Sequence, residues 1–485
     1  MLLPRQFSRR LTRACALAAL VIRPAAAFAQ SPPVTRQSDT LRLSLSEAVS
    51  IAMRQSDEVG IAGAQVEVAD AQYRGARANA MPQLRLSSSY LHVYESARGQ
   101  AVGSVFNQPN TYTTNLNFSQ TLFQGGRIVS TTKAADRTRN ATRFDERETR
   151  AQLTLQVERA YVNALYTERI TQLQRRNLAL ASARLTQVEQ FEKAGRAARY
   201  DVLRARVERS NIEPQALQAQ NDHVLALVEL KRVLNVPVDQ PVALMSQIDS
   251  SSAAEVIASV ADIDGAPDRA STHAAELDLD ARKLTVSAAR ADFYPTVTAF
   301  FQQGYQAFPP IGMGFPTSFG VLTADACAPG GAAGRVCQNG GFFSDRQMGI
   351  NISMPVFDGF RLKSNLDLAQ AQQRLADLQL RQEREQVSVD VARARAELQR
   401  ANAVFAAQRQ NSQEAEEAFR LATLRFSRGL STQLEVMDTQ VALLTAETTE
   451  ARVTYDLFLA ATDLARALGR PIPIPTSAGS PSTQR

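Results

Sequence analysis

The sequence predicts a mainly α-helical protein with a small β part, built from a duplicated unit of long antiparallel helices and β-hairpins. Three observations support this. Residues 117–237 align without a gap to a second stretch beginning at Asn351. Each copy contains one very long segment without proline, 126–191 and 360–426. Each of these segments follows a run in which apolar and polar residues alternate.

The repeat is carried by matched positions rather than by one short motif. The segment from Asn117 to Arg127, which contains Phe-Gln-Gly-Gly-Arg, matches the segment from Asn351 to Arg361, which contains Phe-Asp-Gly-Phe-Arg. The same offset pairs further positions: Gly195 with Gly429, Asp201 with Glu435, Leu234 with Leu468, and Pro237 with Pro471. We therefore divide the chain into repeat 1 (44–237), a connector (238–267) and repeat 2 (268–470).

Composition excludes several classes of protein. The 485-residue chain has a net charge of only +6, and its arginines are interspersed with glutamates along helical stretches, so nucleic acid is not an expected partner. Uncharged apolar runs stay below the roughly 18 residues that a transmembrane helix needs. No nucleophile constellation, phosphate loop or metal cluster is apparent, so we predict neither an enzyme nor a cofactor.

The N-terminus reads as a secretory signal peptide, residues 1–29. Four arginines between Arg5 and Arg13 precede a short apolar segment, and Ala27-Phe28-Ala29 gives the small-residue cleavage pattern. Lipidation of Cys15 is disfavoured because this cysteine lies inside the apolar segment. Residues 30–43 are an N-terminal extension of the mature chain.

Two cysteines remain in the exported chain, Cys327 and Cys337, in a Gly- and Pro-rich stretch, 309–341. In an oxidising compartment this short spacing favours a local disulfide that closes a surface loop. A metal site is the weaker alternative because there is no Cys-x-x-Cys and the three histidines are scattered.

Each repeat is expected to start with a helix, 44–80 in the first and 271–292 in the second. Pro82 and Pro295 end these helices, because proline breaks a helix interior but is tolerated at the first residue of a strand.

Period-two alternation then predicts four strands, at about 83–95, 111–123, 296–308 and 346–357. One face of each is apolar and the other carries polar and small residues. This pattern is typical of a transmembrane β-barrel, and a soluble half-buried sheet is the alternative. Four strands cannot close a barrel, and an open edge in lipid leaves backbone groups unpaired, so several chains would have to share one barrel.

Each repeat ends in a long helical hairpin, 126–235 and 360–468. A continuous helix of this length would reach about 100 Å. Steps of three and four separate the apolar positions of the second rod, which indicates coiled-coil packing. These positions are Leu362, Leu366, Ala369, Ala376, Leu380, Val387, Val391, Ala394, Leu398, Ala401 and Phe405.

Glycines mark the hairpin turns, and prolines mark other changes of direction. Gly195 and Gly429 suit the left-handed residue that terminates a helix. Pro214 predicts a kink in the first returning helix. The connector 238–267 is expected to be irregular, and the tail 471–485, rich in Pro and Ser, is expected to be disordered.

With these strand-end and turn patterns, about residues 40–470 resemble the outer membrane efflux family typified by TolC. The resemblance implies a homotrimer in the outer membrane of a Gram-negative bacterium, with a trimeric α-barrel in the periplasm continued by a shared 12-stranded transmembrane β-barrel. It implies an exit duct for a tripartite efflux or type I secretion system. The partners would be a periplasmic adaptor and an inner-membrane RND or ABC transporter.

The resemblance also assigns roles at the periplasmic tip. Glu435 and Asp438 are three residues apart, so both can lie on one helical face, and the family suggests that they form the periplasmic aperture. Three copies of each would surround one constriction with negative charge and favour cations.

The tip latch departs from the family pattern. In the family, the aspartate at the Asp201 column is linked to a tyrosine and an arginine of the second repeat, and Phe426 and Ser431 stand there in this chain. These side chains cannot make the same polar links. The candidate substitutes are Arg196, Arg199 and Arg428, and the surrounding tip, with Gly195 and Gly429, is the expected adaptor contact.

Two other functions are alternatives. A secreted or surface coiled-coil adhesin would explain the long helices but not the two internal hairpins at matching places in the repeat. A periplasmic enzyme with a helical scaffold lacks a candidate active site. The sequence does not indicate the cargo.

Overall fold

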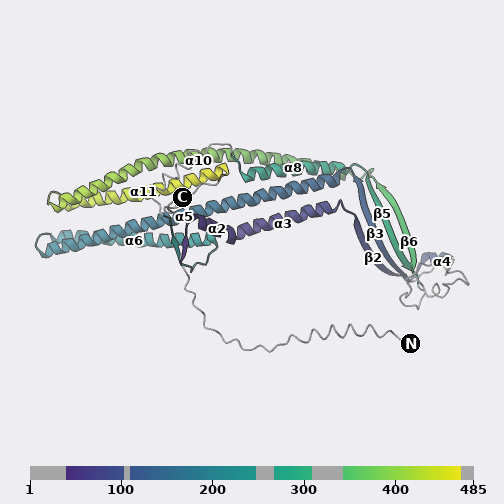
Figure 1. Ribbon diagram of the computed structural model, residues 1–485, viewed down its shortest axis with the longest axis horizontal. Helices are drawn as coiled ribbons and strands as arrows, with labels where there is room; N and C mark the ends of the chain where they lie inside the picture. The colour runs from purple at the N-terminus through teal and green to yellow at the C-terminus, as the bar shows by residue number, and fades with distance from the viewer. Residues whose placement is uncertain (1–39, 103–109, 247–266, 309–341, 471–485) are drawn as a thin grey trace, which may run out of the picture.

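The computed structural model describes residues 40–102, 110–246, 267–308 and 342–470. The molecule is elongated: a bundle of long helices occupies most of its length, and four strands form a sheet at one end (Figure 1). The mainly α-helical fold with a small β part is as predicted.

Two helical hairpins of equal dimensions form the bundle. In the first, α5 (Arg127–Lys193) has 67 residues and α6 (Arg199–Leu234) has 36. In the second, α10 (Arg361–Ser427) and α11 (Gln433–Leu468) have the same two lengths. The helix α6 continues through Pro214. Within the bundle, α5 contacts α6 and α11, and α11 contacts α10, so the four helices form one layer (Figure 1).

The core of the second hairpin follows the coiled-coil positions expected from the sequence. The buried apolar residues of α10 that recur at steps of three, four or seven are Ala369, Ala376, Leu380, Val387, Val391, Ala394, Ala401 and Phe405. Several of them pack against Leu457, Ala461 and Leu464 of α11. Alanine at many of these positions lets the helices approach closely.

The predicted single helix at 44–80 is wrong in one respect, because two helices occupy this range. The helix α2 (Leu45–Gln55) ends at Ser56, and α3 (Asp57–Ala78) begins directly after it. Ser56 has an extended backbone, and its hydroxyl accepts a hydrogen bond from the Glu58 N–H at 3.2 Å. Serine is a strong N-cap. Its capping bond requires an extended backbone at Ser56, so a new helix begins there and α2 ends. In repeat 2, α8 (Ala270–Ala291) is the single counterpart.

The connector, predicted to be irregular, contains a short strand, which is a second correction. The strand β4 (Val242–Leu244) pairs in parallel with β1 (Leu41–Leu43). Both lie on the main hydrophobic core, which α2, α5 and α6 also build. There the buried Tyr161 hydroxyl donates a hydrogen bond to the Leu43 carbonyl at 2.9 Å. The strand forms because β1 lies beside it and supplies hydrogen-bond partners for its backbone groups.

The four remaining strands are β2 (Gln83–His92), β3 (Asn110–Gln124), β5 (Thr296–Ala307) and β6 (Phe343–Ser353), and they form one antiparallel sheet in this order. A short helix, α4 (Ala97–Val102), follows β2. The last strand ends earlier than predicted, before Pro355, which has no N–H to donate to a ladder. In the part of the chain that the structure describes, the outer edges of β2 and β6 have no partner strand.

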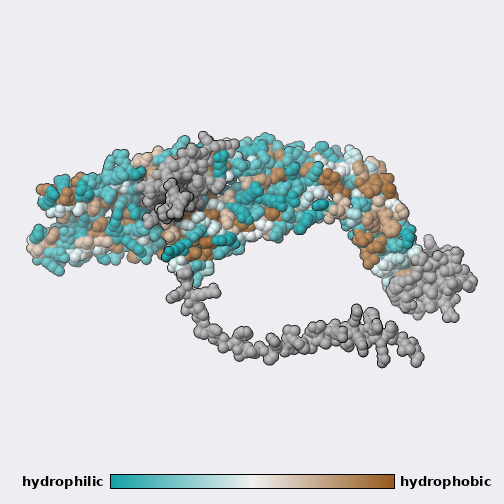
Figure 2. Space-filling model, viewed as in Figure 1, coloured by the Kyte–Doolittle hydropathy of each residue, from teal (hydrophilic) through white to brown (hydrophobic). Residues whose placement is uncertain are grey.

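The strand register separates an apolar from a polar face. One row across the sheet contains Leu84, Phe118, Phe301 and Met348, and the next row contains Arg85, Asn117, Gln302 and Gln347. The hydropathy surface accordingly shows a concentration of hydrophobic residues over the strands (Figure 2). Among the described helices, none is both long and apolar enough to span a membrane.

The junction between β3 and α5 depends on a close approach to α8. Gly125 has φ +55°, and a Cβ on it would lie 2.5 Å from the Ala291 carbonyl oxygen at the end of α8. The next residue, Gly126, has φ +82° but open space around it. Nearby, Arg127 forms an ion pair with Asp292. Gly125 thus holds strand and helix against α8, whereas Gly126 only turns the chain.

We predict that Gly125→Ala lowers the thermal unfolding midpoint more than Gly126→Ala does. Both variants force a left-handed non-glycine residue, which costs about 1 to 2 kcal/mol, but only Gly125→Ala adds a collision with backbone. Circular dichroism of the detergent-purified protein during heating measures the difference. Equal midpoints for the two variants would contradict the close packing of Gly125 on α8.

Candidate functional site

The turns of the two helical hairpins lie together at the end of the bundle away from the strands (Figure 1). Gly195 and Gly429 adopt φ values of 70° and 74°. After each glycine the chain bonds back to its helix: the Arg196 N–H donates to the Phe191 carbonyl at 2.8 Å, and the Leu430 N–H donates to the Arg425 carbonyl at 2.9 Å. These bonds satisfy carbonyls at the helix ends and set both turns in the same shape.

A groove of about 380 Å³ lies between the two turns, and three of the predicted tip residues line it. Arg196 and Asp201 line it from the first hairpin and Phe426 from the second. The Asp201 carboxylate accepts a hydrogen bond from the Ala198 N–H at 3.1 Å and so caps α6. The Arg196 guanidinium lies 5.1 Å from the centre of the Phe191 ring. Both charged groups are therefore engaged within their own hairpin.

The other predicted tip residues stay outside this groove. Ser431 donates a hydrogen bond to the Ala422 carbonyl at 3.4 Å, which ties its turn to α10. Arg199 and Arg428 are exposed, and neither forms an ion pair with a residue described in the structure. Within one described chain, the tip thus contains no arginine–carboxylate link between the two repeats.

Glu435 and Asp438 lie in the first turns of α11 and are exposed. The Glu435 backbone N–H donates a hydrogen bond to the Thr432 hydroxyl at 3.4 Å, and this bond caps the helix. The Glu435 carboxylate takes no part in the capping bond. Neither carboxylate is paired with a described cation. Both can therefore present negative charge to solvent or to another chain.

A polar seam between α5 and α11 joins the two repeats, and the sequence did not reveal it. Its central contact is buried: Gln440 Nε2 donates to Asn177 Oδ1 at 2.9 Å. Along the same seam Arg176 pairs with Glu447. Two further contacts lie closer to the middle of the molecule: Arg159 with Asp463 at 2.5 Å, and Tyr166 stacked on Tyr455 at 5.0 Å. Unpairing a buried amide costs about 1 to 3 kcal/mol, so the seam holds the repeats in one register.

A second groove, of about 440 Å³, runs along this seam towards the tip. It is lined by α5, α10 and α11, with Leu180 and Phe419 as apolar walls and Arg420 as a charged one. Two grooves therefore lead along the bundle to the turns.

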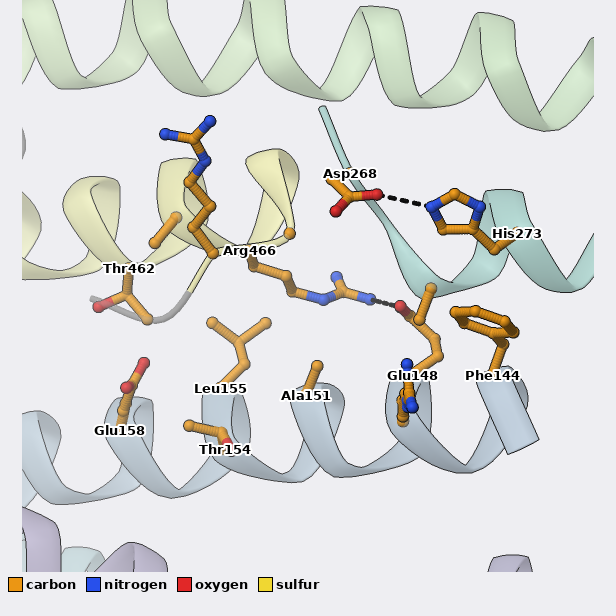
Figure 3. A pocket seen from close by; sticks show the side chains of 15 residues that line it. Phe144, Glu148, Ala151, Thr154, Leu155, Glu158, Asp268, His273, Thr462 and Arg466 are labelled. Carbon is orange, nitrogen blue, oxygen red and sulfur yellow. Dashed lines mark hydrogen bonds and ion pairs between the residues drawn. The ribbon is translucent and has the colours of Figure 1, made fainter. Parts of the chain in front are cut away.

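A larger cavity, of about 590 Å³, lies where α11 ends and α8 begins, with α5 along its other side (Figure 3). Glu148 of α5 lines the cavity and forms two ion pairs, with Arg269 at 3.4 Å and with Arg466 at 3.2 Å. Arg269, which is buried, also pairs with Asp390 of α10 at 3.0 Å. This network connects three helices around the cavity.

Glu158 lines the same cavity and differs from Glu148 in having no hydrogen bond or ion pair with any described residue. Its side chain is only 8% exposed. Burial, and then the nearby Asp463 carboxylate, raise the pKa of Glu158 to about 7. The burial of Glu158 has a signal in the sequence. Glu158 follows Leu155 by three residues and precedes Val162 by four, so it shares a helical face with these two buried residues.

Several predicted features lie outside the described residues. They are the signal peptide 1–29 with Cys15, the Cys327–Cys337 disulfide and the tail 471–485. The disulfide stays a prediction.

The family described as "Outer membrane efflux protein" matches the chain over residues 48–236 and 268–470, which includes nearly all of both repeats. The chain is 26% identical over 483 residues to the outer membrane protein OprJ of Pseudomonas aeruginosa, covering 94% of this chain and 93% of that protein. It is 25% identical over 446 residues to the pyoverdine export outer membrane protein OpmQ of Pseudomonas putida, covering 88% and 85%.

Solved structures share the fold. VceC of Vibrio cholerae superimposes with a TM-score of 0.68 at 22% identity, covering 88% of this chain and 96% of that one. The CmeC outer membrane channel of Campylobacter jejuni gives a TM-score of 0.70 at 14% identity, covering 94% and 95%. The resemblance drawn from the strand-end and turn patterns is thus confirmed.

We predict that Glu158→Gln stabilises the protein at pH 8 and leaves its stability unchanged at pH 4. The folded-state pKa of about 7 lies above the ordinary value of 4.5, so the carboxyl destabilises the fold progressively as pH rises between these values. The full difference at pH 8 is about 3 kcal/mol. Thermal unfolding midpoints of the two proteins across this pH range measure it.

The matched control is Glu385→Gln, which removes an exposed carboxylate of α10 away from the cavity. We expect this variant to follow the parent protein at every pH. If Glu158→Gln also followed the parent protein, the Glu158 carboxylate would not be buried as described.

Proposed function

Because the chain belongs to the outer membrane efflux protein family, we propose that it is the outer-membrane exit duct of a tripartite efflux or type I secretion system. It is an outer-membrane protein with a periplasmic helical portion. In this role it conducts substrate passively to the exterior, and the inner-membrane pump supplies the energy.

The observation that carries the proposal is the open sheet. Its four strands present an apolar face, and the backbone groups along the outer edges of β2 and β6 are unpaired within the described chain. In hydrocarbon each unpaired group costs several kcal/mol, so the edges must meet the edges of other chains. A homotrimer with a shared 12-stranded barrel satisfies this requirement, and its bundles would form one α-barrel.

The long hairpins and their grooves suggest where the partners bind. The rods α5 and α10, each about 100 Å long, can reach deep into the periplasm. At their far end, two grooves of about 380 and 440 Å³ run between the repeats. We propose that helical hairpins of a periplasmic adaptor dock there, with Arg196 and Arg420 among the contacts, and connect the duct to an RND or ABC transporter.

The exposed carboxylates of Glu435 and Asp438 suggest how the entrance works. Three copies of each around one axis would form two rings of negative charge that attract cations and repel one another. Opening would move the tip helices between two packed arrangements. Because Asp201 caps its own helix and Phe426 lacks a hydroxyl group, the closed tip would depend on contacts between chains, with Arg199 and Arg428 as the available cations.

The first test is the mass and conductance of the full-length protein purified in detergent from outer membranes. We expect the mass of three chains by light scattering corrected for detergent, and discrete ion conductance after reconstitution in planar bilayers. A water-soluble monomer without conductance would contradict the proposal and favour the coiled-coil adhesin.

The second test concerns the aperture. We predict that Glu435→Ala combined with Asp438→Ala raises single-channel conductance and lowers the cation preference, because the charge rings and their larger side chains are removed. Reversal potentials in a salt gradient measure the preference. A matched control, Glu385→Ala with Glu383→Ala on α10, removes the same charge away from the tip and should leave both quantities unchanged. Unchanged conductance and selectivity in the tip variant would exclude these residues from the aperture.

A further inference from the structure

The cavity between α5, α8 and α11 is separate from the tip grooves and has no part in the conduction described above. We propose that it is a binding site for a small organic cation that carries an amine, amidine or guanidine group, with the Glu158 carboxylate as the counter-ion. The proposal goes beyond the exit-duct function and does not depend on it.

Glu158 is the one carboxylate of the described cavity wall that lacks a partner. Glu148 is bonded to Arg466 and Arg269. His273 Nε2 lies 2.6 Å from the Asp268 carboxylate. A buried carboxylate without a hydrogen bond is costly unless a ligand compensates it.

The charged groups around Glu158 determine which kind of ligand the cavity suits. Three arginines line the cavity, Arg147, Arg466 and Arg470. Arg466 is bonded to Glu148, and Arg147 lies over the Phe144 ring at 4.9 Å, so neither is bonded to Glu158. Beside Glu158, the nearest further charge on α11 is Asp463, whose own partner is Arg159. The Glu158 carboxylate is therefore a lining charge without a described counter-ion, and a cationic group complements it.

The shape and lining of the cavity also suit an organic cation. Figure 3 shows the Glu158 carboxylate directed from α5 towards Thr462 of α11, at one end of the cavity, with Phe144 at the other. The buried Leu155 and Ala465 form apolar walls between these ends, and the exposed Ala151 marks an opening to solvent. A volume of about 590 Å³ lies in the range of small-molecule sites. An apolar body with one cationic group fits this lining.

The test is calorimetric titration of the full-length detergent-purified protein with benzamidine at pH 8. Benzamide and benzoate are matched neutral and anionic probes of the same shape. We expect benzamidine to bind once per chain, and the two other probes to bind at least about tenfold more weakly, because a charge-assisted hydrogen bond to Glu158 accounts for the difference. The titration does not require conductance, so it stands whether or not the duct is functional.

Two variants locate the site. Glu158→Gln should weaken benzamidine binding at least about tenfold, and Ala151→Leu should weaken it by filling the opening without changing any charge. Glu385→Gln, an exposed carboxylate of α10, should bind like the parent protein. Failure of benzamidine to bind, equal binding of the three probes, or binding that Glu158→Gln and Ala151→Leu leave intact would overturn the proposal. If Glu158→Gln does not fold, Ala151→Leu and the probe series decide.

Discussion

Backbone hydrogen bonding at the two outer edges of the sheet is the constraint on which the architecture depends. In water those edges would be solvated, but the row from Leu84 to Met348 makes one face of the same sheet apolar, as the proposed contact with lipid requires. One chain cannot complete a sheet that has an apolar, lipid-facing surface and also needs every backbone group at its edges hydrogen-bonded. Strand β3 runs directly into α5. An arrangement of the strands in a ring would therefore also place the long helices in a ring.

Much of this fold could be predicted from the sequence because duplication makes each local signal appear twice. The hairpin turns at Gly195 and Gly429 illustrate this, because in both copies a glycine after a long proline-free run indicates the end of a helix. The failures lie where the copies differ. Ser56 interrupts the first helix of repeat 1, and β4 forms only because β1, far away in the sequence, offers it a partner. Neither competition between a cap and a helix nor a non-local pairing is visible in a single stretch of residues.

The candidate sites were less predictable for a similar reason. The resemblance pointed to Asp201 and Phe426, and both line one groove, but it gave no hint that Asp201 would be engaged as a helix cap. The seam of Asn177 with Gln440, and the isolated carboxylate of Glu158, arise from contacts between residues hundreds of positions apart or between three helices. Side-chain charge and spacing alone do not say which neighbours will leave a group without a partner.

The seam between α5 and α11 has a consequence for how such a protein can have arisen and can move. Two hairpins of identical length could in principle alternate around a ring as six separate polypeptides, with every boundary alike. In the proposed trimer, fusion of the two copies in one gene would make the boundaries unequal. The boundary inside a chain is secured by buried amides and ion pairs, whereas the boundary between chains would be free to evolve weaker contacts. In that proposed ring, mechanical compliance would be confined to the three boundaries between chains, while the three boundaries within chains remain stiff.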